Sequence, residues 1–262
     1  MSVSEQVDLF LLGAGVAFPD HLTVQTIESL SVCRCICTNL PAERLSNLPE
    51  DIRSKCISLW PLYQDGRIRS ENYSDVTEAV LQQAESSLPI AWLTPGHPMI
   101  FDSVSKALLK AAQARNWRFT VVPAISSLDT LLAEVAYDPA SGLAVYDATG
   151  LVRRGISLVP SVALVVLQIS VFLSDRAHIT LRNTRPDLSP LRDHLLKFFP
   201  GEHPCAVVRS SSSITQPPQI TWVELNRLAD VPVEVLAGAS LFVPRLEEHR
   251  KIENNGNSGK MA

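Results

Sequence analysis

Two tyrosines and two arginines lie close together in the segment from Tyr63 to Tyr73, which reads YQDGRIRSENY. By composition this is a polar loop that leads into the start of a helix. On a helix Arg69 and Tyr73, four positions apart, would share one face. A guanidinium a few ångströms from a phenol favours the ionised phenol, whose pKa is ordinarily near 10. By composition alone an ordinary surface loop is the favoured interpretation of this segment, and a phenolate that accepts a proton is the alternative with which the spacing is compatible.

Three loops rich in glycine, proline and small residues each follow an apolar run. They are Gly13-Ala-Gly15, Thr94-Pro-Gly-His-Pro98 and the segment from Val121 to Ser127, VVPAISS. Glycine allows a backbone to approach a ligand closely. The first loop lacks the third glycine of a dinucleotide-binding fingerprint, because Ala17 and Phe18 follow it. Taken alone, it is typical of an ordinary turn between a strand and a helix.

The elements that position these loops alternate between strand and helix. We predict strands over 7–12, 31–37, 89–93 and 118–122, and helices over 23–30, 72–87 and 101–115. This alternation predicts a mostly parallel α/β domain over residues 1–127, whose ligands would bind at the carboxyl ends of the strands. A second α/β domain of more antiparallel character is predicted over 128–245. The polar stretch 246–262 is predicted to be a disordered tail.

The three loops, taken in order, resemble those of the tetrapyrrole methylase superfamily of S-adenosylmethionine-dependent methyltransferases. The usual family forms are a glycine loop followed by Leu-Thr, then Gly-Asp-Pro, then Val-Pro-Gly-Ile-Ser/Thr. This chain has His97 in place of the aspartate and Ala124 in place of the glycine. Gly-His-Pro followed by an aliphatic residue and Phe101 is instead similar to the borosin branch, as are Val104-Ser105 and residues 137–142. Borosin enzymes methylate backbone amide nitrogens of a ribosomal peptide.

The resemblance covers most of residues 7–245, and it implies a fold of two α/β domains with the cofactor cleft between them. It implies S-adenosyl-L-methionine as the cofactor, S-adenosyl-L-homocysteine as the product, and no metal. The residues that it places around the cofactor are Gly13, Gly15, Pro95, Gly96, His97, Pro98, Ile100, Phe101, Val104, Ser105, Ser126, Gln168, Ala239 and Ser240.

The resemblance also assigns roles in the segment that opened this section, because borosin methyltransferases carry an Arg-x-x-x-Tyr pair there, preceded by a tyrosine. Tyr73 is accordingly the candidate base, Arg69 its electrostatic partner, Tyr63 a hydrogen-bonding or positioning group, and Arg67 a possible substitute for Arg69. A base is needed because an amide nitrogen is a poor nucleophile. Pro95 stands where borosin enzymes tend to have a tyrosine, so the acceptor could differ or the activity be reduced.

The bulk properties of the chain limit the classes of partner. The 262 residues carry a formal net charge of −4, so no global basic field favours nucleic acid or an anionic membrane. No signal peptide is evident at the start, and a reducing cytoplasm is the expected compartment. Cys33, Cys35 and Cys37 alternate along a predicted strand and are expected to be buried core thiols on one face rather than metal ligands.

The resemblance further implies a homodimer. Fused borosins carry their substrate as a C-terminal extension that ends in an apolar core, and residues 247–262 contain no apolar repeat. We therefore expect the acceptor to be a separate precursor peptide. Two alternatives remain open at this stage: a methyltransferase that acts on a tetrapyrrole-like or other small cyclic acceptor, and a catalytically inactive scaffold or binding protein of the same fold.

Overall fold

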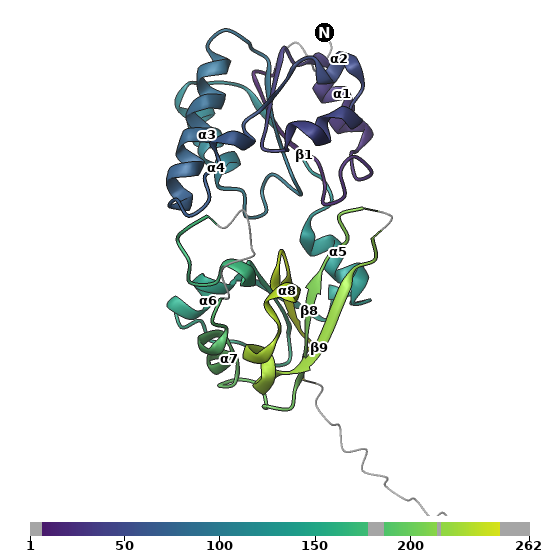
Figure 1. Ribbon diagram of the computed structural model, residues 1–262, viewed down its shortest axis with the longest axis vertical. Coiled ribbons are helices and arrows are strands. Elements are labelled where there is room, and N and C mark those ends of the chain that lie inside the picture. Colours follow the sequence, from purple (N-terminus) through teal and green to yellow (C-terminus); the bar gives the residue numbers. More distant parts are fainter. Residues whose placement is uncertain (1–6, 178–185, 214–215, 247–262) are drawn as a thin grey trace, which may run out of the picture.

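The computed structural model describes residues 7–177, 186–213 and 216–246, which form two halves (Figure 1). Each half contains a five-stranded β-sheet with its own helices. The N-terminal half is the sheet of β1 to β5 with α1 to α4, and the C-terminal half is the sheet of β6 to β10 with α5 to α8. The predicted fold class, α/β with two sheets, is confirmed. The domain boundary predicted at residue 127 stays a prediction. Of the predicted tail 246–262, Leu246 is described and donates from its amide to the carbonyl oxygen of Pro160 over 2.7 Å, and residues 247–262 lie outside the described residues.

The N-terminal sheet is parallel throughout and has the strand order β3-β2-β4-β1-β5. Its strands are β1 (Leu9–Gly13), β2 (Cys35–Thr38), β3 (Cys56–Ser58), β4 (Ile90–Thr94) and β5 (Phe119–Val122). Its helical segments are α1 (Val24–Val32), η2 (Ala42–Asn47), α2 (Glu50–Arg53), η3 (Trp60–Leu62), α3 (Arg69–Ala84) and α4 (Ser103–Ala114). Because parallel strands end at the same edge of a sheet, the loops after β1, β4 and β5 are neighbours.

Both faces of this sheet are buried, which explains the continuous apolar runs in the sequence. Along β1, Phe10 and Leu12 pack into one core cluster and Leu9 and Leu11 into another, as the two-residue period of a strand requires. The second cluster also holds apolar side chains of α3 and α4, among them Val76. Figure 1 shows α3 and α4 on one side of the sheet and α1 and α2 on the other.

The C-terminal sheet is mixed and has the strand order β6-β7-β10-β8-β9, with one parallel pair, β6 and β7. Its strands are β6 (Leu143–Asp147), β7 (Ala163–Leu167), β8 (Pro204–Arg209), β9 (Gln219–Glu224) and β10 (Ser240–Val243). Its helical segments are α5 (Ser127–Glu134), η4 (Pro139–Ser141), α6 (Ala148–Arg153), η5 (Ile169–Val171), α7 (Ser189–Leu195), η7 (Leu225–Asp230) and α8 (Val233–Leu236). The more antiparallel character predicted for this half is confirmed.

The structure also corrects two expectations about the elements. Helix α3 begins at Arg69, three residues before the predicted start at Asn72, so Arg69 belongs to its first turn. Cys33 was predicted on the second strand, but it is the C-cap residue that follows α1, and it packs into the core cluster opposite to that of Cys35 and Cys37. The helix runs two residues further than predicted, to Val32, and this displaces Cys33 from the strand. All three thiols are buried, as expected.

Within the described part of the chain, no helix has both the length and the apolar character needed to cross a membrane.

Candidate active site

Backbone hydrogen bonds join two of the strand-end loops of the N-terminal sheet. The amide of Ala14 donates to the carbonyl oxygen of Thr94 over 2.8 Å. Gly15 and Gly96 donate to each other's carbonyl oxygens over 3.2 and 2.9 Å. Their φ angles are 73° and 71°, in the region that favours glycine. The structure therefore brings Gly15 and Gly96, both predicted around the cofactor, into direct contact.

Gly13 ends β1 at the point where all three loops meet. A Cβ on Gly13 would lie 2.5 Å from the Cβ of Ala124 and 2.5 Å from the carbonyl oxygen of Gly96, so a side chain is excluded there. Gly96 is different, because a Cβ at that position would meet no described atom within 4 Å. Gly13 thus allows the loops to pack together, and the backbone of Gly96 is open on one side.

The other predicted residues of the loop between β4 and α4 have local or packing contacts. Pro95 is exposed, and Pro98 is buried. The Nδ1 atom of His97 accepts a hydrogen bond from the amide of Met99 over 3.0 Å, which fixes the turn. Ile100 packs against the core of the C-terminal half. The loop therefore belongs to the N-terminal half and contacts both halves.

Asp102 positions the start of α4, and the sequence analysis did not single it out. Its carboxylate accepts hydrogen bonds from the amides of Val104 and Ser105 over 2.9 and 3.1 Å, from the Ser105 hydroxyl over 2.8 Å, and from the Trp92 indole over 3.1 Å. An aspartate just before an apolar helical stripe is an N-cap signal that could have revealed it. The predicted cofactor residues Val104 and Ser105 are buried beneath this cap.

Ser126 caps the next helix, α5, in a similar way. Its side chain and its backbone amide both contact the carboxylate of Asp129, at 2.6 and 2.7 Å, and its hydroxyl oxygen accepts from the amide of Asp129. This reciprocal arrangement is a capping box. Ser126 is only 1% exposed. The structure therefore gives its side chain a helix-capping contact at the carboxyl edge of the N-terminal sheet.

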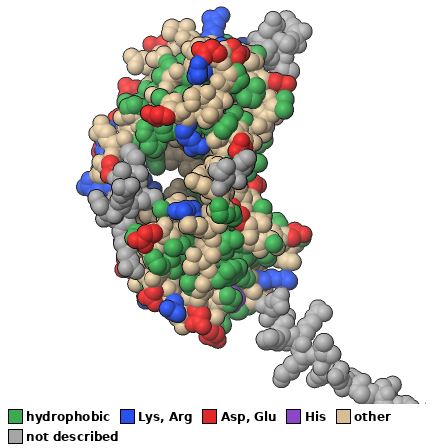
Figure 2. Space-filling view, turned by 45° about the vertical axis from the view of Figure 1, so that its right-hand side comes forward, with side chains coloured by type: hydrophobic (Ala, Val, Ile, Leu, Met, Phe, Trp, Pro, Cys, Tyr) green, Lys and Arg blue, Asp and Glu red, His purple; other side chains and the backbone are tan. Residues whose placement is uncertain are grey.

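A pocket of about 500 Å³ lies between the two halves. In the space-filling view the surface is hollowed between the upper and lower halves (Figure 2). We call it the cleft pocket; it is lined by Ile68, Arg69, Ser70, Tyr73, Phe101, Asp102, Ser103, Lys106, Asp147, Thr149, Gln168 and Asp175. Four of these residues were predicted from the sequence, two as catalytic and two as cofactor-binding, namely Arg69, Tyr73, Phe101 and Gln168.

Arg69 and Tyr73 lie on the first turns of α3 and face the cleft pocket together. The guanidinium of Arg69 donates a hydrogen bond from Nη2 to the carbonyl oxygen of Ser174, 2.6 Å away in the C-terminal half. This hydrogen bond of Arg69 is thus made to a carbonyl oxygen of the opposite half and not to the phenol of Tyr73. Spacing along the helix correctly placed the two side chains on one wall, but it gave no information about that partner.

Tyr63 lies behind Tyr73, outside the lining of the cleft pocket. The two rings meet edge to face, with centroids 6.3 Å apart and planes at 66°. Burial raises the pKa of the Tyr63 phenol well above its usual value, and a hydrogen bond from the Asn39 side chain opposes that change. Tyr63 therefore stays a neutral phenol near pH 7, able to donate a hydrogen bond. Asn39, which follows β2, was not singled out from the sequence.

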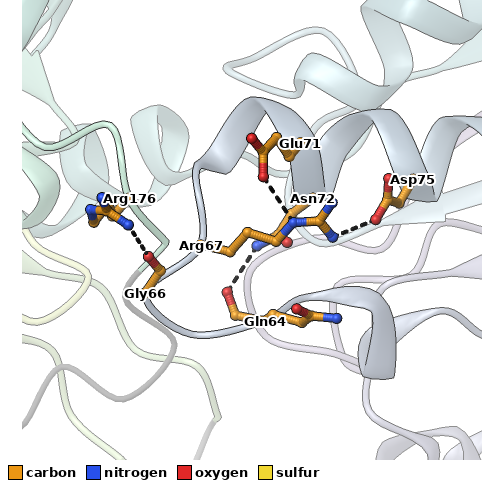
Figure 3. A network of polar contacts seen from close by, with 7 residues as sticks. All are labelled: Gln64, Gly66, Arg67, Glu71, Asn72, Asp75 and Arg176. Atoms are coloured by element: carbon orange, nitrogen blue, oxygen red, sulfur yellow. Dashed lines mark hydrogen bonds and ion pairs between the residues drawn. The ribbon is translucent and has the colours of Figure 1, made fainter.

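Arg67 faces a different direction from Arg69. Its guanidinium forms ion pairs with Glu71 and Asp75, at 3.0 and 2.5 Å, along the side of α3 (Figure 3). Arg67 is not part of the cleft-pocket lining. The structure thus places one of the two arginines on the pocket wall and pairs the other with carboxylates.

The C-terminal wall of the cleft pocket contains Asp147, Thr149, Gln168 and Asp175. Asp147 caps α6 by accepting from the Gly150 amide over 2.6 Å. Gln168 follows β7 with φ 61°, a left-handed conformation that side chains seldom adopt. Asp147 ends β6 and Gln168 follows β7, so the end-of-strand signal that singled out the glycine loops also applied here. Gln168 was singled out by the family resemblance, and the end-of-strand signal was applied to neither residue.

Ala239 and Ser240 are the predicted cofactor residues that lie furthest into the C-terminal half. Both are buried, at 2% and 7% exposure, at the start of the central strand β10. They do not line the cleft pocket. Among the described residues, no group of three or more His, Cys, Asp or Glu side chains is arranged to hold a metal ion.

A family model, Tetrapyrrole (Corrin/Porphyrin) Methylases, matches residues 8–224 of the chain. Curated relatives include a methyltransferase/ribosomally synthesized type II borosin cyclic peptide precursor of Phlebiopsis gigantea, 25% identical over 97% of this chain and 46% of that protein. Another is the methyltransferase/ribosomally synthesized cyclic peptide omphalotin A precursor of Omphalotus olearius, 24% identical over 75% of this chain and 47% of that protein. The chain thus spans about half the length of these relatives.

Among solved structures, the chain is similar to uroporphyrin-III C-methyl transferase from Thermus thermophilus complexed with S-adenosyl homocysteine. The TM-score is 0.59 at 16% sequence identity, and the match covers 90% of this chain and 92% of that one. A second structure of an enzyme with that name and source matches with a TM-score of 0.56 over 92% of this chain. At this identity the likeness establishes the fold.

Proposed function

The chain belongs to the tetrapyrrole (corrin/porphyrin) methylase family, and on that premise we propose that it is an S-adenosylmethionine-dependent methyltransferase acting on backbone amide nitrogens of a peptide. The match to the family over residues 8–224 supports methyl transfer. The printed names of the curated relatives, at about 25% identity, support a peptide acceptor.

One observation carries the choice of site. Arg69 and Tyr73, the candidate catalytic residues, line the same pocket as Phe101 and Gln168, two of the predicted cofactor residues. Arg69 and Tyr73 lie on α3 and Phe101 in the loop before α4, all in the N-terminal half, whereas Gln168 follows β7 in the C-terminal half. A group able to accept a proton and a group able to contact a cofactor therefore face one space. Such a juxtaposition is what a transfer between two bound molecules needs.

The residues present fit S-adenosylmethionine. A volume of about 500 Å³ is within the roughly 300–1,000 Å³ typical of small-molecule sites. Phe101 and Gln168 face the pocket from the two halves, and Gly96, which lies outside the pocket lining, has a backbone that is open on the side where a Cβ would stand. We assign these three residues to cofactor binding. When bound, S-adenosylmethionine supplies an electrophilic methyl group and becomes S-adenosylhomocysteine.

The chain's own residues then have distinct tasks. Tyr73 is proposed as the base that accepts the proton of the acceptor amide, and Arg69, on the same wall, is its proposed electrostatic partner. The neutral phenol of Tyr63 packs against the Tyr73 ring and positions it. Arg67 is still proposed as a possible substitute for Arg69. Because Arg67 already forms ion pairs with Glu71 and Asp75, Arg69 is favoured as the electrostatic partner of Tyr73.

The acceptor is proposed to be a separate precursor peptide, and the enzyme a homodimer. A direct test is mass spectrometry of the purified chain with S-adenosylmethionine and a candidate precursor peptide, added as a separate molecule. Steps of about 14 Da, the mass of one CH₂ group, located on backbone nitrogens by fragmentation, are expected. Size-exclusion chromatography with light scattering checks the dimer.

The same experiment separates the rivals when a cyclic tetrapyrrole is offered in parallel. Methylation of the ring and not of the peptide would overturn the peptide acceptor while keeping the cofactor. If neither the peptide nor the ring is methylated and isothermal titration detects no binding of S-adenosylhomocysteine, the protein is a scaffold of this fold and the enzyme proposal is wrong.

A further inference from the structure

A short antiparallel ladder joins the two halves at one side of the cleft pocket. It pairs residues 66–69, which lead into α3, with residues 174–177 of the C-terminal half, and its centre is a bridge between Ile68 and Arg176. Three backbone hydrogen bonds form it: Gly66 N to Ala177 O at 2.8 Å, Ala177 N to Arg67 O at 2.7 Å, and Arg69 N to Asp175 O at 2.8 Å. A pairing of this kind fixes the register of the two segments.

Two arginine side chains extend the ladder, one from each half. The Nη1 atom of Arg176 donates to the carbonyl oxygen of Gly66 over 2.8 Å, as Figure 3 shows. In the opposite direction, Arg69 donates from Nη2 to the carbonyl oxygen of Ser174 over 2.6 Å. Hydrogen bonds from a charged donor are worth more than those between neutral groups. Arg69, a proposed catalytic residue, is therefore part of the contact between the halves.

The segment 66–69, whose Gly66 carbonyl oxygen accepts from Arg176, is also restrained by contacts within the N-terminal half. The side-chain amide of the buried Asn72 donates to the carbonyl oxygen of Gln64 over 3.0 Å, and the ion pairs of Arg67 hold its side chain along α3 (Figure 3). The turn at Gly66 has φ 73°, which glycine adopts without strain. The first turn of α3 is thus restrained on both of its sides.

The other segment of the ladder continues directly from the C-terminal wall of the cleft pocket. Gln168 lines that wall; the chain then passes through η5 and a left-handed residue, Leu173, with φ 57°, before it reaches Ser174. The amide of Leu173 is tied to the hydroxyl of Thr149, another lining residue, at 2.9 Å. The same short stretch of backbone therefore carries a proposed cofactor contact at one end and the partner of Arg69 at the other.

We propose that residues 174–177 position the acceptor side of the pocket relative to its cofactor side, and that Arg176 is the positioning residue that fixes the turn at Gly66. The inference rests on the proposed function. Arg176 itself is exposed and does not line the pocket, so it acts through Gly66 and the first turn of α3. A displacement of about 1 Å at a reacting group can lower a rate by about 100-fold.

The test compares Arg176→Ala, the conservative Arg176→Lys and the control Arg154→Ala. Arg154 is also an exposed arginine, and its side chain donates to the backbone carbonyl oxygen of Gly150 over 3.2 Å. Arg154 and Gly150 both lie in the C-terminal half, so this hydrogen bond does not join the two halves. Three quantities are measured for each variant: hydrogen exchange of amides 66–73, the dissociation constant of S-adenosylhomocysteine, and kcat and KM for the peptide acceptor.

Arg176→Ala is expected to speed exchange of amides 66–73 and to lower kcat about 10- to 100-fold, with the dissociation constant of S-adenosylhomocysteine changed less than about twofold. Arg176→Lys should restore part of kcat, because it keeps a charged donor, and Arg154→Ala should match the unmodified chain. Unchanged exchange in Arg176→Ala overturns the inference, as does faster exchange with unchanged kcat. If the unmodified chain transfers no methyl group to any acceptor, the proposed function fails first, and the exchange data still decide whether Arg176 holds α3.

Discussion

The proposed catalytic residues and the proposed cofactor residues of the cleft pocket lie on different kinds of backbone. The N-terminal wall carries Arg69 and Tyr73 on regular turns of the 16-residue helix α3, where spacing along the sequence fixes which side chains share a face. The C-terminal wall carries Gln168 on a left-handed residue between a strand and a 3₁₀ turn. Phe101, the proposed cofactor contact from the N-terminal half, is left-handed as well, with φ 57°. Groups proposed for chemistry thus lie on a rigid element, and both of these proposed cofactor contacts lie on backbone that its surroundings must hold in place.

The largest effect is expected from Tyr73→Phe on the helical wall. Removal of the phenol oxygen deletes the proposed base and should lower methyl transfer at least about 100-fold, while S-adenosylhomocysteine still binds. Single-turnover transfer and isothermal titration measure the two quantities. Tyr137→Phe is the matched control, since the Tyr137 hydroxyl donates to the carbonyl of Gly142 at 3.0 Å, outside the pocket lining. Equal losses of transfer and of binding would show that Tyr73 is structural.

On the opposite wall, Gln168→Gly is expected to weaken the binding of S-adenosylhomocysteine without lowering the free energy of unfolding. The change relieves a left-handed conformation that costs about 1–2 kcal/mol, and glycine loses about 0.5–1 kcal/mol more on folding, so the free energy of unfolding should rise by no more than about 1.5 kcal/mol. Affinity for S-adenosylhomocysteine should fall about tenfold, by the roughly 1.4 kcal/mol of a lost hydrogen bond.

Leu173→Gly is the control for Gln168→Gly, because it relieves the same kind of conformation, φ 57°, at a residue that does not line the pocket. Titration calorimetry and denaturant unfolding give the two readouts. The contrast between the walls is lost if Leu173→Gly weakens binding as much as Gln168→Gly does.

The two halves can also be compared through their buried thiols. Burial raises the pKa of Cys33 in the N-terminal half and of Cys205 in the C-terminal half, each to about 12. Both thiols stay protonated in the folded chain after they have ionised in the unfolded chain, above pH about 9. The free energy of unfolding should therefore fall between pH about 9 and 12, by up to about 1.4 kcal/mol per pH unit for each thiol.

Urea unfolding of Cys33→Ala, Cys205→Ala and the unmodified chain at pH 7.5 and at pH 10.5 measures this dependence. Each substitution should make the loss of stability at high pH smaller. A variant with the same loss as the unmodified chain would show that its thiol is not protected from ionisation by the fold.

The smallest effect is expected from Arg67→Ala. The ion pairs of Arg67 with Glu71 and Asp75 are partly exposed, and such pairs contribute at most about 1 kcal/mol. Methyl transfer should stay within about twofold, whereas Arg69→Ala should lower it at least tenfold because Arg69 faces the pocket. A loss in Arg67→Ala as large as that in Arg69→Ala would assign the electrostatic role to Arg67 instead.

Much of the fold could be predicted because its signals are local. Buried strands such as β1 and β4 stand out as apolar runs, and α4 as an apolar stripe. The short elements α2, β3 and α6 were not predicted, because three to six residues are too few for a period to be visible. The candidate site was predicted in part: the pair on α3 was found, but Asp102, Asp147, Thr149 and Asp175 were not.

What the sequence determined by itself is the alternation of strands and helices, the glycine loops at strand ends, and the shared face of Arg69 and Tyr73. Each of these depends on residues only a few positions apart, through the 3.6- and 2-residue periods of helix and strand. The tertiary structure alone decided that Gly15 pairs with Gly96, that Arg69 binds the carbonyl of Ser174, and that Arg67 does not line the pocket. Some of these contacts join residues that are far apart in the chain, and others depend on which side of α3 the C-terminal half covers. Local periodicity carries no information about the pairing of distant residues or about which side is covered.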